Sequence, residues 1–334
     1  MKILLVGYYG AQNAGDEWLL EKTKQLLTKR WPNNEYVILH TKNLVQNGCR
    51  YVKKFSWNLI KSIYEVDAVV FGGGSVLQDV TSKKSLYFYF LIIWLAKLAG
   101  KKVWLIGQGM GPFMAWGSWW LVKQTLFLVD GIAVRDQESS DLLKKMRIKP
   151  SKQVLAADLA FWQAGFSKEV PRKGDKLMVS LRNYPIFLDN WLKLAEFFKK
   201  NTDEKLFFDV QRGEDQKKMF ELSKRMDIYD MQAVLEQSVE MPGVGMMLGM
   251  RYHALVWAIL RRIPFLALVY DDKVLALAKE FGQEFVDLRK PMPAKELFEK
   301  YEKIKNNYQD YVQKMGCKLP TIIARANLNE RVLN

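Results

Sequence analysis

Two spacings of apolar residues alternate along the chain, and together they predict a succession of strands and helices. Short continuous apolar runs, such as residues 3–7, predict strands that are covered on both faces. Runs with apolar residues three or four positions apart predict amphipathic helices. In the first half of the chain the predicted strands are 3–7, 36–39, 67–71, 103–107, 131–134 and 154–156, and the predicted helices are 16–30, 86–98 and 121–129.

The same alternation starts again after a polar segment at residues 163–176. The predicted strands of the second half are 177–181, 206–210, 244–248, 264–269 and 281–286, and the predicted helices are 191–200, 252–260 and a lysine-rich stretch at 294–332. We therefore expect an α/β protein with two Rossmann-like, doubly wound domains, residues 1–168 and 169–334, the second including the terminal helical segment. Ligands of such sheets bind at the carboxyl ends of the strands, so we expect a site in a cleft between the domains.

Glycine-rich segments follow three of the strands predicted in the first domain, and glycine lets backbone approach a ligand closely. They lie at residues 7–17, 71–79 and 107–112. Asn13 or Asp16 in the first segment can cap the following helix, where backbone amides can face an anion. The glycine spacing matches neither a dinucleotide fingerprint nor a P-loop.

The second glycine segment also carries polar side chains that suit sugar hydroxyl groups. Gly73 and Gly74 are followed by the hydroxyl of Ser75, the amide of Gln78 and the carboxylate of Asp79. A simple turn is the alternative interpretation for each glycine segment. Three such segments at one sheet edge nevertheless favour a binding site.

The second domain contains an Arg-x-His sequence at a predicted strand-to-helix junction, formed by Arg251 and His253. An anion at this position gains backbone amides, the helix dipole and a guanidinium group. Arg182 follows a neighbouring strand, so two arginines are expected to clamp a small anion. The alternative is structural: Arg251 paired with a carboxylate, His253 packed in the core and Arg182 in a salt bridge.

The balance of charge favours an anionic partner, because 51 Lys and Arg residues outnumber 36 Asp and Glu residues and give a net charge of +15. The basic residues are dispersed and form no nucleic-acid module, so we expect no nucleic-acid partner. A cluster of Trp116, Trp119, Trp120 and Lys123 suits the headgroup region of an anionic membrane. Core or dimer contacts are the alternative for these tryptophans.

The cellular compartment and the absence of a metal are predicted from sequence features that the chain does not have. Cys49 and Cys317 are too few for a disulfide framework, and the start of the chain has no signal-peptide pattern, so we expect a cytoplasmic protein. The longest apolar run, residues 86–96, is shorter than the roughly 20 residues of a membrane-spanning helix. No cluster of metal-ligating residues is evident, so we expect neither a metal nor a cofactor.

Taken in order along the chain, these segments resemble the polysaccharide pyruvyl transferase family, and most closely the CsaB-type enzymes that modify bacterial secondary cell-wall polymers. The segments that carry the resemblance are 7–17, 72–82, 107–112, 134–136, 157–158, 180–182, 249–254 and 270–274. The family is similar in architecture to GT-B glycosyltransferases. The resemblance implies a reaction in which pyruvate moves from phosphoenolpyruvate to a sugar as a 4,6-ketal. The acceptor it implies is a lipid-diphosphate-linked saccharide with a terminal β-linked N-acetylmannosamine, reached at the cytoplasmic face of the membrane.

The resemblance also assigns roles to residues. Phosphoenolpyruvate is expected at Arg182, Arg251, Tyr252 and His253, where Tyr252 replaces the leucine usual in the family. Arg251 and His253 are the expected catalytic residues, with His253 as general acid or base. The expected acceptor contacts are Asn13, Asp16, Gly73, Gly74, Ser75, Gln78 and Asp79. The acid that protonates the methylene carbon stays open among Asp16, Asp79 and Asp158.

Two other functions compete with this one. The first is a GT-B glycosyltransferase that uses a nucleotide sugar, because a fold alone does not fix an activity. The second is a non-catalytic protein that binds an anionic polymer through its positive charge.

Overall fold

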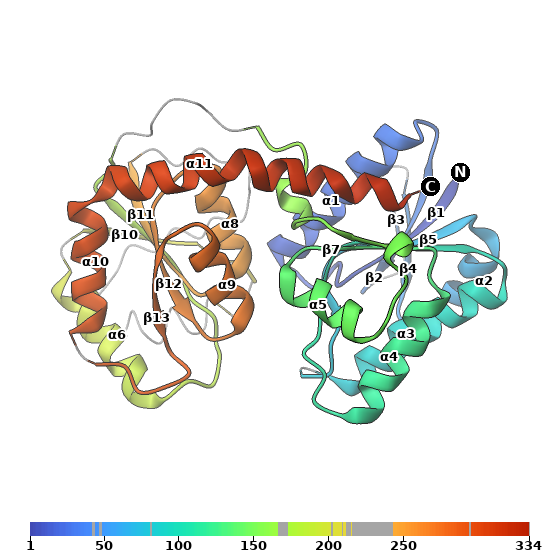
Figure 1. Cartoon of the computed structure of the whole chain (residues 1–334), viewed down its shortest axis with the longest axis horizontal. Helices are drawn as coiled ribbons and strands as arrows, with labels where there is room; N and C mark the ends of the chain where they lie inside the picture. The colour runs from blue at the N-terminus through green and yellow to red at the C-terminus, as the bar shows by residue number, and fades with distance from the viewer. Residues whose placement is uncertain are drawn as a thin grey trace. The chain divides into compact units, whose positions relative to one another are not determined.

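The chain folds into two compact units, each built around its own parallel sheet (Figure 1). The computed structural model describes residues 1–41, 44–46, 49–80, 82–165, 173–201, 203–208, 210–211, 215, 243–293 and 295–333. The first unit comprises residues 1–164 and 322–334, and the second comprises residues 165–321. Within the described residues, no helix is long and apolar enough to cross a membrane.

The first unit contains an eight-stranded sheet in the order β3-β4-β2-β1-β5-β6-β7-β8. Neighbouring strands are parallel except for the edge pair β3 and β4. The strands are β1 (Lys2–Val6), β2 (Glu35–His40), β3 (Leu44–Gln46), β4 (Cys49–Lys53), β5 (Ala68–Leu77), β6 (Lys102–Met110), β7 (Gly131–Val134) and β8 (Gln153–Leu155). The helices are α1 (Ala14–Arg30), α2 (Trp57–Glu65), α3 (Lys83–Leu98), α4 (Trp116–Leu128), α5 (Gln137–Lys145), and the 3-10 turns η1 (Pro150–Lys152) and η2 (Leu159–Phe161).

The glycines predicted to form loops after two strands lie inside those strands, which corrects that prediction. Strand β5 continues to Leu77, and β6 continues to Met110. The two strands stay paired through the glycines, with Gly74 opposite Gln108, and their register shifts between Gly74 and Leu77. Gly73 and Gly74 have φ angles of +72° and +82°, which an L side chain rarely adopts. The glycines therefore bend a paired strand and do not form an open turn.

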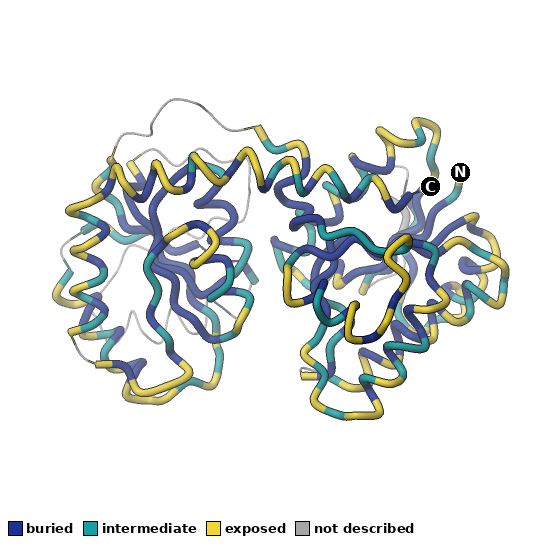
Figure 2. Tube along the Cα trace, viewed as in Figure 1, coloured by how far each residue is buried: buried dark blue, intermediate teal, exposed yellow. Residues whose placement is uncertain are grey.

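The second unit contains a five-stranded parallel sheet in the order β10-β9-β11-β12-β13. Its strands are β9 (Lys176–Ser180), β10 (Glu204–Phe207), β11 (Val244–Gly249), β12 (Phe265–Val269) and β13 (Glu284–Asp287). Its helices are α6 (Leu188–Lys200), α8 (Tyr252–Leu260), α9 (Asp272–Glu280) and α10 (Glu296–Asn306), and α11 (Tyr308–Asn327) follows them. The last residues of α11 and the 3-10 turn η3 (Leu328–Val332) belong to the first unit. Figure 2 shows the strands of both sheets as buried chain, with exposed residues concentrated on helices and connections.

The end of the chain packs against the first unit, whereas the sequence placed all of residues 169–334 in the second domain. Helix α11 begins in the second unit, and its last residues belong to the first. There the Asn329 side chain accepts a hydrogen bond from the Gly107 amide at 2.7 Å and donates one to the Ala157 carbonyl at 3.0 Å. These buried contacts fix residues 322–334 to the first sheet. The predicted boundary between residues 168 and 169 lies outside the described residues.

Candidate functional site

Three neighbouring strands of the second sheet bring polar side chains to their carboxyl ends. Arg182 follows β9, Arg251 follows β11 and Tyr270 follows β12. The register pairs Gly249 with Ser180, and the Met250 amide donates to the Ser180 carbonyl at 2.7 Å. Because the strands are parallel and adjacent, these residues lie at the same edge of the sheet.

Arg251 is held in a buried ion pair. Its Nε donates to Asp215 Oδ2 at 2.9 Å, a second nitrogen donates to Asp215 Oδ1, and the same nitrogen donates to Gln211 Oε1 at 3.0 Å. Asp215 is 0% exposed and Arg251 is 6% exposed. Arg251 is thus paired with a carboxylate, which is the structural alternative that the sequence analysis gave for this residue. The pair fixes the guanidinium at the start of α8 but neutralises its charge.

Arg182 carries positive charge at the same edge and makes a different set of contacts. Its Nη1 donates to the Tyr270 hydroxyl at 2.9 Å, and its guanidinium carbon lies 5.2 Å and 5.5 Å from the ring centroids of Tyr270 and Tyr184. Burial alone would lower the pKa of Arg182, but Tyr270, Asp271 and Asp215 raise it above its usual value. The group is therefore a fixed cation held by aromatic rings, which suits it to binding an anion.

Tyr252 and His253 occupy the first turn of α8, directly after Arg251. Their rings meet edge to face with centroids 5.3 Å apart. The structure therefore gathers Arg251, Tyr252 and His253 at one helix start. Arg182 lies beside this group, because its backbone amide donates to Met250 Sδ at 3.4 Å, directly before Arg251.

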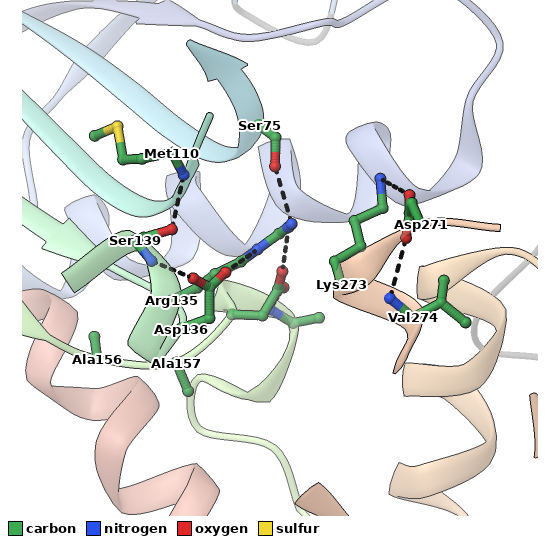
Figure 3. A network of polar contacts seen from close by, with 12 residues as sticks. Ser75, Met110, Arg135, Asp136, Ser139, Ala156, Ala157, Asp271, Lys273 and Val274 are labelled. Carbon is green, nitrogen blue, oxygen red and sulfur yellow. Dashed lines mark hydrogen bonds and ion pairs between the residues drawn. The ribbon is translucent and has the colours of Figure 1, made fainter. Parts of the chain in front are cut away.

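The next helix of the second unit begins with a capped carboxylate. Asp271 Oδ1 accepts a hydrogen bond from the Val274 amide at 3.1 Å, and Lys273 Nζ lies 3.1 Å from Asp271 Oδ2 (Figure 3). This cap fixes the start of α9 directly after Tyr270. The cap and the Tyr270 hydroxyl bond together hold the edge of the sheet where Arg182 lies.

In the first unit, several of the predicted acceptor residues surround the start of α1. Asn13 caps the helix by accepting a hydrogen bond from the Gly15 amide at 3.1 Å, and it donates to Asp16 Oδ2 at 2.6 Å. A side chain on Gly74 would begin 3.6 Å from Asp16 Oδ1, so the bent strand β5 passes close to this carboxylate. Gly73 abuts Leu19 of the same helix. The structure thus brings Asn13, Asp16, Gly73 and Gly74 together.

Ser75 takes part in a charged network centred on Arg135 (Figure 3). Arg135 donates to Ser75 Oγ at 2.9 Å and to Asp158 Oδ2 at 3.3 Å, and its Nε lies 3.4 Å from Asp136 Oδ2. A side chain on Gly109 would begin 2.5 Å from Ser75 Oγ and 2.9 Å from Arg135 Nε, so only glycine fits there. The network fixes the Ser75 hydroxyl and engages Asp158, one of the candidate acids.

Asp79 makes structural contacts. Its two carboxylate oxygens accept hydrogen bonds from the backbone amides of Met114 at 2.7 Å and Ala115 at 3.1 Å, directly before α4. Burial opposes its ionisation, but these amides hold the pKa of Asp79 below its usual value. Both oxygens are therefore engaged in anchoring the start of α4, and the neighbouring Gln78 is the more exposed of the two side chains.

Lys54 is a residue of this region that the sequence interpretation missed. It follows β4, and its Nζ donates to the Tyr89 hydroxyl at 3.2 Å and lies 4.9 Å from the Tyr8 ring centroid. Burial lowers the pKa of Lys54, and the nearby Asp16 opposes that shift. Two adjacent lysines, Lys53 and Lys54, are typical of a solvent-exposed surface, so the sequence alone does not indicate that Lys54 is partly buried. A prediction of strand β4 would have placed Lys54 at the same carboxyl edge as the glycine segments.

Comparison with known proteins gives a family and a fold. The family model described as polysaccharide pyruvyl transferase matches residues 13–272, which include the residues gathered in both units. Comparison with curated protein sequences gives no match.

Solved structures resemble the chain over its whole length at low sequence identity. One is HepE of Anabaena in complex with UDP-glucose, at 10% identity and a TM-score of 0.62, covering 100% of this chain and 98% of that chain. Another is the UDP-GlcNAc 2-epimerase of Neisseria meningitidis bound to UDP-GlcNAc, at 12% identity and a TM-score of 0.61, covering 100% of both chains. A glycosyltransferase of Rickettsia africae has 14% identity and a TM-score of 0.60, covering 99% and 96%.

These likenesses confirm the predicted α/β architecture of two Rossmann-like domains resembling GT-B glycosyltransferases, and at such low identity they concern the fold alone. The predicted cleft between the domains stays a prediction. The family model spans most of the chain and includes the Arg182 and Arg251 segments as well as the bent glycine strand. The chain belongs to the polysaccharide pyruvyl transferase family.

Proposed function

We propose that this transferase takes the pyruvyl group from phosphoenolpyruvate, attaches it to a sugar and releases phosphate. The observation that carries the proposal is the Arg182 guanidinium at the carboxyl edge of the second sheet, where the backbone amide of Arg182 contacts Met250 just before the start of α8. Phosphoenolpyruvate has a carboxylate and a phosphate close together. A fixed guanidinium and the amides of a helix start are groups that bind such a small polyanion.

The reaction requires two additions at the central carbon of phosphoenolpyruvate. A first sugar hydroxyl adds to this carbon and loses its proton, while the methylene carbon gains a proton and becomes a methyl group. Loss of phosphate then leaves an oxocarbenium-like centre, to which the second hydroxyl adds with loss of its proton. Arg182 and the start of α8 stabilise charge on the leaving phosphate, and His253 moves a proton as general acid or base.

We place the acceptor on the first unit. Asn13 and Asp16 at the start of α1, with Ser75 and Gln78 at the end of β5, offer amide, carboxylate and hydroxyl groups of the kind that bind sugar hydroxyls. The acceptor we propose is the terminal β-linked N-acetylmannosamine of a lipid-diphosphate-linked saccharide, as in CsaB-type enzymes, and the product is a 4,6-ketal. Such an acceptor requires the enzyme to work at the cytoplasmic face of a membrane.

Donor binding tests the proposal against a nucleotide-sugar glycosyltransferase, because several solved structures of similar fold bind UDP sugars. We expect phosphoenolpyruvate, and not a UDP sugar, to raise the melting temperature of the protein. Arg182→Gln should abolish this rise. Arg261→Gln is a matched control at the opposite end of α8, where Arg261 stacks on Trp257, and it should retain the rise. A rise with UDP sugars alone would overturn the proposal.

A further inference from the structure

Helix α3 is apolar on its exposed side as well as on its buried side. Tyr87, Leu91, Trp94 and Leu98 are all exposed, and Leu98 is 81% exposed. Their spacing of four, three and four residues places them in one stripe along the helix. The buried side holds Leu86, Phe88, Phe90, Ile92 and Ile93. A helix that is apolar all round is normally covered on all sides, so the exposed stripe lacks the water-facing residues expected of a surface helix.

Helix α4 carries a second stripe of the same kind beside the first. Trp116, Trp120, Lys123 and Phe127 recur at the same spacing, and Trp116 is 79% exposed. The two helices pack together, since Trp94 Nε1 donates to Thr125 Oγ1 at 3.0 Å. Figure 1 shows α3 and α4 side by side on one face of the first sheet, and Figure 2 shows exposed chain along them. We call these eight residues the α3–α4 face.

The stretch of chain that forms the α3–α4 face carries charge of a single sign. The sequence contains no Asp or Glu between Asp79 and Asp130, and the lysines within that stretch are Lys83, Lys84, Lys97, Lys101, Lys102 and Lys123. Lys97 and Lys102 pair with Asp130 at the far end of α3. Lys83 and Lys84 lie exposed at its start, and Lys123 lies within the stripe of α4. The two carboxylates that border this stretch are both engaged, Asp79 by the backbone amides before α4 and Asp130 by Lys97 and Lys102. An apolar surface whose own helices carry lysines and no Asp or Glu is complementary to an anionic partner with an apolar interior.

We propose that the α3–α4 face docks the enzyme on the surface of an anionic lipid bilayer. Tryptophan and tyrosine place an apolar ring and a polar group at the same depth, which suits the headgroup region. The lysines add attraction to anionic lipids. A second copy of the chain is a poorer occupant, because a two-fold contact through this face would set lysines against lysines with no carboxylate on α3 or α4 to pair them.

The proposal also refines the sequence interpretation of this region. Trp119, which the sequence grouped with Trp116 and Trp120, is partly buried against the core of the first unit and is not part of the face. Helix α3 contributes four exposed apolar residues to the face, and α4 contributes three. The docking face deepens the proposed function by naming the surface through which a lipid-linked acceptor is reached, and in that respect it rests on the proposed function.

Vesicle co-sedimentation tests the docking face without any catalytic step. Wild-type protein should sediment with phosphatidylglycerol-containing vesicles and much less with pure phosphatidylcholine vesicles, and added salt should weaken the binding. The double variant Leu91→Glu with Trp120→Glu should bind anionic vesicles at least about tenfold more weakly. Its binding no longer transfers these two apolar side chains from water into the bilayer. Leu188→Glu with Leu192→Glu is the matched control, since both are exposed leucines one turn apart at the start of α6 in the second unit.

A second variant separates docking from folding. Lys83→Gln with Lys84→Gln removes only charge at exposed positions, and it should weaken binding to anionic vesicles without changing the melting temperature. Vesicle binding that both double variants retain would overturn the proposal. So would a wild-type dimer in vesicle-free solution that the Leu91/Trp120 variant dissociates, because a second copy would then cover the face.

Activity measurements distinguish a failed docking face from a failed function. With a water-soluble disaccharide acceptor, the Leu91/Trp120 variant should release phosphate from phosphoenolpyruvate at the wild-type rate. With the acceptor embedded in anionic vesicles, its rate should fall together with its binding. If the wild-type protein releases no phosphate with either acceptor, the proposed function fails while the vesicle-binding result still decides the docking face.

Discussion

The variant Asp215→Asn is predicted to destabilise the second unit strongly, because it leaves a buried guanidinium without its counter-charge. Asp215 accepts two hydrogen bonds from Arg251 and a third from the Gln211 amide at 3.0 Å. Asparagine keeps the shape of the side chain but replaces one accepting oxygen with a donating NH2 group. That NH2 group would face a nitrogen of Arg251 or the backbone amide of Gln211. At least one buried donor would then lose its acceptor, and Arg251 would lose its counter-charge.

The expected size of the effect follows from the burial of both partners. Removing one partner of a buried ion pair costs about 3–5 kcal/mol. The total stability of a domain is about 5–15 kcal/mol, so the loss would be a large fraction of it. The matched control is Asp189→Asn, which breaks the pair of Asp189 with Lys193 one turn apart on α6. The Asp189 side chain is 61% exposed, and such pairs contribute about 0–1 kcal/mol.

Urea unfolding followed by circular dichroism gives the free energy of unfolding for the wild type and both variants. Hydrogen exchange of the amides in α8 then locates the change, because Arg251 begins that helix. We expect Asp215→Asn to lower the stability by several times the effect of Asp189→Asn. A loss within about 1 kcal/mol of the control would refute the conclusion that a buried pair holds Arg251.

The remaining predictions concern donor binding, the start of α4 and proton transfer. Arg182→Lys keeps the charge but loses the planar group that reaches Tyr270, so the KM for phosphoenolpyruvate should rise about tenfold or more in a phosphate-release assay, and an unchanged KM would contradict the donor site. Asp79→Ala should lower the free energy of unfolding by about 1–3 kcal/mol at neutral pH. Because the pKa of Asp79 is lowered in the folded state, its contribution is present above the unfolded pKa and is lost as the pH falls through the folded value. Urea unfolding at decreasing pH should therefore show the two proteins converging in acid, and a difference that stays constant would argue against the ionised cap. His253→Gln should lower kcat by about 10²–10⁴ with little change in the KM for phosphoenolpyruvate, and wild-type turnover would remove His253 from the role of general acid or base.

The strands and helices with strong local patterns could be predicted from the sequence. The continuous apolar runs correspond to β1, β7, β9 and β11, and the predicted helix at 252–260 has the observed bounds of α8. Strand β4 and helix α2 are short elements without a continuous apolar run, and the apolar spacing alone does not predict them. The predicted strand at 67–71 ends at the glycines, because a run of glycines normally indicates a turn. The pairing with β6 shows that β5 continues through them.

The contacts that decide the role of a side chain are less visible in the sequence, because they join distant positions. The ion pair of Arg251 with Asp215 spans 36 residues, and the bond from the Gly107 amide to Asn329 spans 222 residues. Periodicity reports which face of a helix or strand is buried, but it does not report which partner a buried polar group finds. The position of Arg182 and Arg251 at one sheet edge could be predicted because parallel strands share a carboxyl end. The network that Arg135 forms around Ser75 could not.

Pyruvyl transfer is tested by measuring phosphate release in the presence of phosphoenolpyruvate and a synthetic lipid-diphosphate disaccharide with a terminal β-linked N-acetylmannosamine. We expect phosphate release only when both substrates are present, together with a saccharide product that carries a pyruvate ketal on its terminal sugar, detected by mass spectrometry and NMR. We also expect Arg182→Gln to abolish both signals and Arg261→Gln to retain them. Release of UDP from a UDP sugar in the presence of the same acceptor, with no phosphate released from phosphoenolpyruvate, would rule out pyruvyl transfer by this enzyme.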